Sequence, residues 1–127
     1  MFTRRLLLAL VMAFGLQFSS ASAEDPQIVH MVYFSLKEPT KANKEAMVAG
    51  CKKYLKDIDG IVYFSSGIRG EAFARDINDK EFDVSLNIVF KNKAAHDKYS
   101  DHPKHLEFIK EFKDQMAKVR VFDSEVK

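Results

Sequence analysis

The sequence predicts one α+β domain in which an antiparallel β-sheet carries its helices on a single face. Its 127 residues suffice for one ordinary domain and are too few for two. Apolar residues alternate or run together in four short segments, as in strands, and recur every three or four residues between them, as in helices. These segments follow one another as β-α-β-β-α-β, with the second helical part in two pieces. This order builds one antiparallel sheet that is covered on one side.

The first half of the domain is expected to form a strand, a helix and a second strand. Residues 28–36 are β-branched and aromatic and predict the first strand. Thr40 is the expected N-cap of a helix that ends at Asp57. Residues 61–68 predict the second strand, and the polar residues 69–80 predict a mobile loop. The apolar stripe of the helix has spacings of four, four and three residues: Met47, Cys51, Leu55 and Ile58.

Cys51 is the single cysteine, so the chain cannot form an internal disulfide bond. Its place on the apolar stripe predicts a small buried side chain. The alternatives are a nucleophile or an intermolecular disulfide, and no neighbour in the sequence activates the thiol.

The second half is expected to add two strands and a helical segment in two pieces. Residues 82–90 alternate between apolar and polar side chains, apart from Val89, and predict the third strand. Residues 92–101 predict a short helix, and Pro103 suits the first turn of a second one that Asp101 or His102 caps. Residues 119–123 predict the last strand. The inward stripe of the last helix is expected to hold His105, Ile109, Phe112 and Met116, with Phe108 beside it.

The sheet face without helices predicts a homodimer. It is expected to carry apolar side chains from the first strand and polar ones from the third: Val29, Met31, Tyr33, Asp83, Ser85 and Asn87. An apolar strand surface that no helix covers is most simply buried by a second copy across a two-fold axis. The polar side chains predict that the enclosed region is partly wet.

The N-terminus resembles a secretory signal peptide. Arg4 and Arg5 precede an apolar run over residues 6–16, and residues 21–23 supply the small side chains of a cleavage site. We therefore expect a signal peptide over residues 1–23, a domain over residues 24–127, and an exported protein that has no stable membrane anchor after cleavage. The apolar run is about half as long as a membrane span, so a retained anchor is the weaker interpretation. A twin-arginine signal is the alternative export route.

The net charge argues against functions that require a strongly basic surface. The whole chain has 20 basic and 18 acidic side chains. Without Arg4 and Arg5 the count is 20 − 2 = 18 basic against 18 acidic side chains, which leaves no net charge. A neutral domain lacks the positive surface that binds nucleic acid or anionic lipid, so we expect neither partner.

Two histidines and a tyrosine are the candidate chemical groups. His30, Tyr99 and His105 can converge between the sheet and the helices, where an imidazole and a phenol can exchange a proton with a ligand. The competing interpretation is that His30 and His105 only form hydrogen bonds with backbone groups. His102 is expected to act as a helix cap, and His96 is expected to be solvated.

Metal binding and several enzyme classes find no support in the sequence. His102 and His105 have a spacing that helical metal ligands use, but no carboxylate or cysteine completes the set, so no metal or other cofactor is expected. The chain has no glycine-rich phosphate loop, no G-x-S-x-G elbow and no paired-carboxylate pattern.

Five segments together resemble the stress-responsive dimeric α/β barrel (Dabb) family. They are His30-Met-Val-Tyr-Phe34, Ile58-Asp-Gly60-Ile61, Phe82-Asp-Val-Ser-Leu-Asn-Ile-Val-Phe90, Tyr99-Ser-Asp-His-Pro-Lys-His105-Leu-Glu-Phe108 and Val119-Arg-Val-Phe-Asp123. The resemblance implies a ferredoxin-like monomer and a dimer whose sheets form a barrel.

The resemblance also implies which residues would transfer protons. One branch of the family is similar to the plant polyketide cyclase that closes olivetolic acid, in which a tyrosine and a histidine transfer protons. They match Tyr99 and His105 here, and a histidine of its pocket matches His30. This sequence has Val84 where the cyclase has another histidine, and Ile109 where it has a glycine, which implies a smaller cavity.

Three functions follow as hypotheses. The first is an exported homodimer that binds a small apolar ligand without an assigned reaction. The second is a cyclase or lyase in which Tyr99 and His105 act as an acid–base pair on a carbonyl-containing molecule. The third is a cofactor-free or haem-handling monooxygenase, since dimeric barrels of this shape also host those. The expected ligand pocket consists of His30, Val32, Phe34, Val84, Leu86, Tyr99, His105, Phe108 and Ile109.

Overall fold

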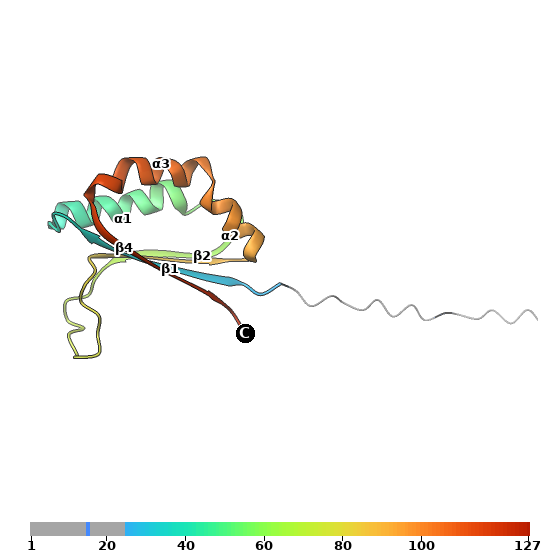
Figure 1. Cartoon of the computed structure of the whole chain (residues 1–127), viewed down its shortest axis with the longest axis horizontal. Coiled ribbons are helices and arrows are strands. Elements are labelled where there is room, and N and C mark those ends of the chain that lie inside the picture. The colour runs from blue at the N-terminus through green and yellow to red at the C-terminus, as the bar shows by residue number, and fades with distance from the viewer. Residues whose placement is uncertain (1–14, 16–24) are drawn as a thin grey trace, which may run out of the picture.

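The chain forms the α+β domain that the sequence predicts (Figure 1). The structure, a computed structural model, describes Gly15 and residues 25–127, so the expected signal peptide and its cleavage site lie almost wholly outside the described residues. The elements in chain order are β1 (Ile28–Leu36), α1 (Lys41–Leu55), β2 (Ile61–Ile68), β3 (Val84–Phe90), α2 (Lys93–Ser100), α3 (Pro103–Phe112), the short 3-10 helix η1 (Lys113–Gln115) and β4 (Met116–Glu125).

The four strands form one antiparallel sheet in the order β2-β3-β1-β4. The two central strands are β1 and β3, which are the most apolar segments of the domain. Because β1 pairs along its whole length with β4, His30 lies directly opposite Asp123 and Val32 lies opposite Val121. This register places side chains from both strands on the same face of the sheet.

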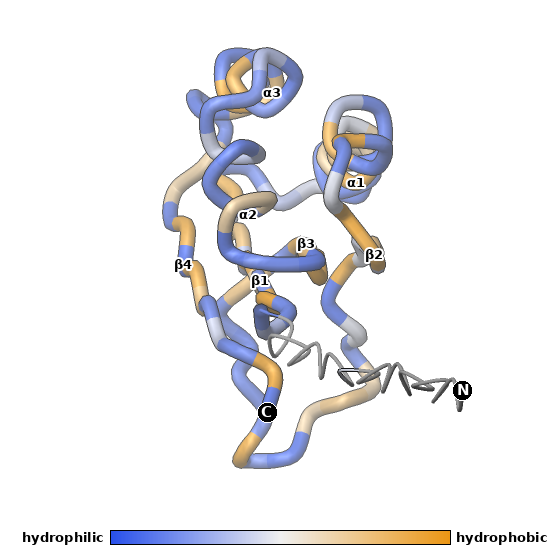
Figure 2. Tube along the Cα trace, turned by 90° about the vertical axis from the view of Figure 1, so that its right-hand side faces the viewer, coloured by the Kyte–Doolittle hydropathy of each residue, from blue (hydrophilic) through white to orange (hydrophobic). Residues whose placement is uncertain are grey.

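All helices lie on one face of the sheet, as expected (Figure 1). Figure 2 shows α1 and α3 side by side above it, with α1 on the side of β2 and α3 on the side of β4. Each of the three α-helices begins at a side-chain cap. Thr40 accepts the backbone N–H of Asn43, Asn92 accepts that of Ala95, and His102 accepts that of Lys104.

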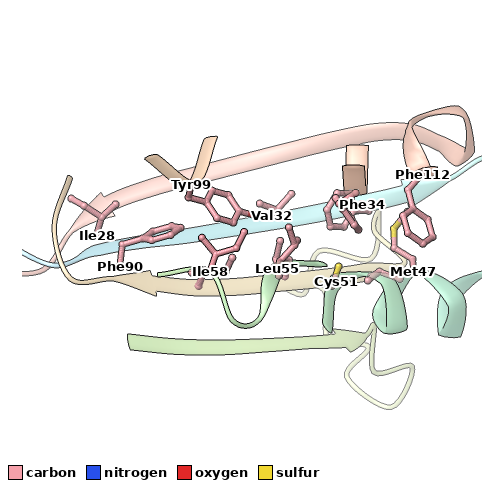
Figure 3. Packing of buried hydrophobic residues seen from close by; sticks show 14 of the residues in the cluster. Ile28, Val32, Phe34, Met47, Cys51, Leu55, Ile58, Phe90, Tyr99 and Phe112 are labelled. Atoms are coloured by element: carbon pink, nitrogen blue, oxygen red, sulfur yellow. The ribbon is translucent and has the colours of Figure 1, made fainter. Parts of the chain in front are cut away.

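The core fills the layer between the sheet and the helices (Figure 3). Met47, Leu55, Ile88 and Phe90 are fully buried, and burying a side chain of this size contributes roughly 1.5–3 kcal/mol to stability. Cys51 is also fully buried on the stripe predicted for it.

Several boundaries differ from the prediction. Strand β3 begins at Val84 instead of residue 82. Helix α1 ends at Leu55, before Asp57. Helix α3 ends at Phe112, so Met116 does not continue its stripe and instead begins β4. Strand β4 is longer than the predicted 119–123, because pairing with β1 supplies hydrogen bonds beyond the segment that its own side chains identify.

The opposite face of the sheet carries no helix. Tyr33 contacts Phe82 and Phe122 there, with ring centroids 4.9 and 6.0 Å apart. The connection between β2 and β3 extends from this side of the sheet (Figure 1), and Asp79 in it binds Arg120 of β4 at 2.7 Å. Among the helices formed by residues 25–127, none has the length and hydropathy needed to cross a membrane.

Candidate functional site

A cavity of about 340 Å³ lies between the helix-covered face of the sheet and the α2–α3 segment. It is lined by His30, Val32, Phe34, Leu86, Tyr99, His105, Phe108, Ile109, Met116, Val119 and Val121. The lining is almost entirely apolar, and its polar side chains are two imidazoles and one phenol. The cavity opens beside Ile109, Val119 and Val121, whose side chains are partly exposed.

Tyr99 reaches the cavity from the last turn of α2, and it is 2% exposed. Its ring packs 5.0 Å from the ring of Phe90. Burial raises the pKa of Tyr99 well above its ordinary value. The phenol therefore keeps its proton at any physiological pH and offers it as a hydrogen-bond donor.

His105 stands in the first turn of α3, with its ring 4.5 Å from that of Tyr99. Its Nδ1 lies 2.9 Å from the carbonyl oxygen of Ser100, and because a carbonyl only accepts, Nδ1 is the donor. Burial lowers the pKa of His105, and the Ser100 carbonyl opposes this only in part. The imidazole is therefore neutral near pH 7, and its Nε2 carries a free lone pair.

His30 is held on the cavity wall by Asp123. Its Nδ1 donates to Asp123 Oδ1 at 2.5 Å, across the paired strands β1 and β4. The ring of His30 lies 5.7 Å from the ring of Tyr99 in an edge-on arrangement. The carboxylate thereby fixes the orientation of the imidazole, with Nδ1 as the proton donor.

The prediction that His96 is solvated is wrong. Its side chain is only 20% exposed, its ring lies 5.2 Å from that of His30, and its Nε2 lies 3.3 Å from Asp123 Oδ1. Lys93 and Asp97 beside it in the sequence suggested a polar surface. Lys93, His96 and Asp97 line a second, open depression of about 420 Å³.

The cavity contains eight of the nine residues predicted for the pocket. Val84 is the exception, because it is fully buried in the core and does not line the cavity. Met116, Val119 and Val121 were not predicted, although the alternation along β4 places the last two on the face of His30. Asp123 was also missed, since only the β1–β4 register brings it to His30.

His102 and His105 each use Nδ1 to bond a backbone group. His102 Nδ1 accepts the backbone N–H of Lys104 at 3.1 Å and serves as the helix cap, which was one of the two caps expected. His105 Nδ1 is bonded to Ser100. The two imidazoles are therefore used for separate backbone groups.

Several solved structures share this fold. A Dabb family protein with a ferredoxin-like fold from Mesorhizobium loti is 24% identical, with a TM-score of 0.66 over 79% of this chain and 96% of that one. An Arabidopsis thaliana protein is 22% identical, with a TM-score of 0.66 over 79% of this chain and 95% of that one. A hydroxynitrile lyase from Passiflora edulis is 18% identical, with a TM-score of 0.66 over 80% of this chain and 94% of that one.

No curated protein matches the chain significantly. Other structures of the same fold, from Thermobifida fusca and Bacteroides fragilis, are described as dimeric proteins of unknown function. The family model of the stress responsive A/B barrel domain matches residues 28–126, which is nearly all of the described domain. The chain therefore belongs to the stress responsive A/B barrel domain (Dabb) family.

Proposed function

We propose that this protein is an exported homodimer whose cavity binds a small apolar molecule that carries one carbonyl group. The observation that carries the proposal is the cavity itself, which joins an apolar wall to Tyr99 and His105. Apolar pockets with a few convergent polar groups are the usual form of small-molecule sites. The partly exposed Ile109 and the short apolar wall favour a compact ligand over one with a long alkyl tail.

The carbonyl group follows from the protonation states of the two polar side chains. Tyr99 keeps its proton and can donate a hydrogen bond to a ligand oxygen, while neutral His105 offers an acceptor. A net hydrogen bond of this kind contributes about 0.5–1.5 kcal/mol, which corresponds to a roughly 2- to 13-fold preference for the polar ligand. The apolar wall supplies the rest of the binding free energy.

Acetophenone and ethylbenzene test this proposal as a matched pair, because they differ chiefly in the carbonyl oxygen. We expect both to bind in calorimetry or NMR titration, with acetophenone bound more tightly and Tyr99→Phe removing the difference. Equal affinities in the wild-type protein would contradict the assignment of the carbonyl to Tyr99.

Variants that block the cavity test whether the ligand binds there. Ile109→Trp should abolish binding of acetophenone because Ile109 lines the cavity. Leu106→Trp is the matched variant on the same helix, 53% exposed and outside the cavity, and should bind normally. The wild-type chain has no tryptophan, so each variant also reports on its surroundings by fluorescence. Loss of binding in both variants, or in neither, would place the ligand elsewhere.

The second candidate function is an acid–base reaction of the cyclase or lyase type. It is favoured by the adjacent rings of Tyr99 and His105, of which one group holds its proton and the other has a free lone pair. In a lyase reaction on a cyanohydrin, His105 Nε2 would take the hydroxyl proton, the C–CN bond would break, and cyanide would leave as the carbonyl forms. Tyr99 would donate to the substrate oxygen.

Mandelonitrile tests the lyase reaction, since its cleavage releases benzaldehyde and cyanide. If the reaction occurs, we expect His105→Gln and Tyr99→Phe each to lower kcat by about 10²- to 10⁴-fold. The Leu106→Trp variant should keep the wild-type rate. Wild-type turnover that both active-site variants retain would refute the assignment of the two residues.

Export is the remaining part of the proposal. It is supported by the arginine pair, the apolar run and the small residues before position 24. Expression of the whole chain in a Gram-negative host should yield periplasmic protein that begins at Glu24, as N-terminal sequencing would show. Protein that keeps residues 1–23 in the cytoplasm would contradict it.

A further inference from the structure

Three side chains with metal-ligating atoms meet where β1, β4 and α2 come together. They are His30, His96 and Asp123, and their donor atoms all lie within 4.8 Å of one another. Strand register fixes the first contact, because His30 and Asp123 are directly paired residues. Packing fixes the other, because the ring of His96 lies 5.3 Å from the ring of Phe90, edge to face. The Tyr99–His105 chemistry proposed above does not use His96.

The hydrogen bonding within this cluster is incomplete. Asp123 Oδ1 already accepts the proton on His30 Nδ1. His96 Nε2 lies 3.3 Å from the same oxygen, yet it is buried and has no hydrogen-bond partner within residues 25–127. Buried polar atoms without partners are unfavourable and rare, so each one calls for an explanation. A cation between the three side chains would give both imidazole nitrogens and the carboxylate a partner.

We propose that His30 Nδ1, His96 Nε2 and a carboxylate oxygen of Asp123 bind one divalent transition-metal ion, with Zn²⁺ as the best fit. Two imidazoles and one carboxylate suit Zn²⁺ and its first-row neighbours, whereas Ca²⁺ and Mg²⁺ require mostly oxygen ligands. When the ion binds, the proton leaves His30 Nδ1 and Nε2 carries the one proton of the neutral ring, so that Nδ1 coordinates through its lone pair. Tetrahedral zinc separates its ligand atoms by about 3.4 Å, so small side-chain rotations complete the site.

The surroundings of His96 support the proposal. Its Nδ1 lies 3.6 Å from Asp97 Oδ1, and Lys93 Nζ holds the other oxygen of Asp97 at 2.7 Å. A carboxylate beside the second nitrogen is the usual support for an imidazole that binds a metal. The open depression lined by His96, Asp97 and Asp123 gives the ion a path from solvent and leaves space for a water molecule as fourth ligand.

Titration of the purified protein, without a histidine tag, with Zn²⁺ and with Co²⁺ tests the site. We expect one Zn²⁺ per chain by calorimetry, a rise in Tm with Zn²⁺, and the visible absorption of four-coordinate Co²⁺. His96→Ala and Asp123→Asn should each weaken binding by more than about 100-fold, because loss of even a supporting residue costs 10- to 100-fold. Ca²⁺ and Mg²⁺ should not compete.

The matched control is His102→Asn, which removes an imidazole near the cluster in sequence and keeps a residue that caps α3 well. This variant should bind Zn²⁺ as the wild-type protein does. His96→Ala introduces a strong helix former into α2, so circular dichroism should show a folded protein. Failure of the wild-type protein to bind Zn²⁺ would overturn the proposal. So would Zn²⁺ binding that His96→Ala leaves intact or that His102→Asn reduces equally.

Discussion

Burial gives the two side chains at the centre of the cavity opposite acid–base properties. Tyr99 is displaced toward its neutral, proton-bearing form, and His105 is displaced toward its neutral, proton-free form. Both shifts have desolvation as their largest cause, because a charge on either ring would lose contact with water. A proton donor and a proton acceptor therefore stand side by side.

Stability should depend on pH through His105. Because its pKa in the folded protein lies below the ordinary value of 6.5, the unfolded chain binds more protons as the pH falls past 6.5. The contribution of neutral His105 to the free energy of unfolding is complete above pH 6.5 and declines as the pH falls toward the lowered pKa. The neighbouring charges act in both directions, since Asp101 raises this pKa while His30 and His102 lower it.

Urea unfolding between about pH 5 and pH 8 measures this dependence. We expect His105→Gln to flatten the decline in the free energy of unfolding on the acid side. An identical acid-side slope in the variant and the wild-type protein would contradict the burial effect.

The thiol of Cys51 should be unreactive in the folded protein. It is fully buried, and desolvation raises its pKa to about 11, so almost no thiolate forms at neutral pH. Iodoacetamide followed by mass spectrometry should label Cys51 only in urea. A Cys51→Ala, Lys52→Cys variant moves the thiol to the adjacent exposed position and should react without denaturant. Rapid labelling of the folded wild-type protein would contradict this, because it would show that reagent reaches Cys51 on the packed face of α1.

At the scale of elements, the contact between α1 and α3 depends on one glycine. A β-carbon at Gly50 would overlap Cε2 of Phe112, which is buried and has its ring centroid 5.1 Å from that of Phe108. The absence of a side chain at Gly50 therefore allows α1 to approach α3 closely. Since α3 forms the roof of the cavity, this contact also sets the position of His105 above the sheet.

Gly50→Ala should destabilise the protein in spite of the better helix propensity of alanine. The propensity gain is about 1 kcal/mol, whereas crowding a packed core costs about 1–3 kcal/mol. We expect a net loss of about 1 kcal/mol in urea unfolding. Phe112→Leu should cost less in the Gly50→Ala background than in the wild-type protein, which a double-mutant cycle would measure. A more stable Gly50→Ala variant would show that Phe112 moves freely.

For the molecule as a whole, the uncovered sheet face supports assembly into a dimer. It carries the aromatic contact of Tyr33, Phe82 and Phe122, and Phe122 is 53% exposed in the single chain. Domains of the same fold are described as dimeric. A second copy placed on this face would bury its apolar side chains and leave the cavity on the helix side of each copy.

Phe122→Lys should therefore weaken dimerisation, because it would bury a charge in the interface. Light scattering should show a dimer for the wild-type protein and a monomer for the variant at equal concentration. Leu106→Lys is the control, since Leu106 is equally exposed but lies on α3. A wild-type monomer, or a dimer that tolerates Phe122→Lys, would exclude this interface.

Local patterns along the chain were enough to predict the α+β class, the strands over 28–36 and 61–68, the helix caps at Thr40 and His102, and the tyrosine and histidines near the cavity. These features depend on side chains close together in the sequence, so periodicity, turn residues and family motifs reveal them. The cavity wall from β4 and the cluster of His30, His96 and Asp123 depend on how β1 pairs with β4. Strand register joins residues 93 positions apart and leaves no local pattern, so these contacts could be recognised only in the folded chain.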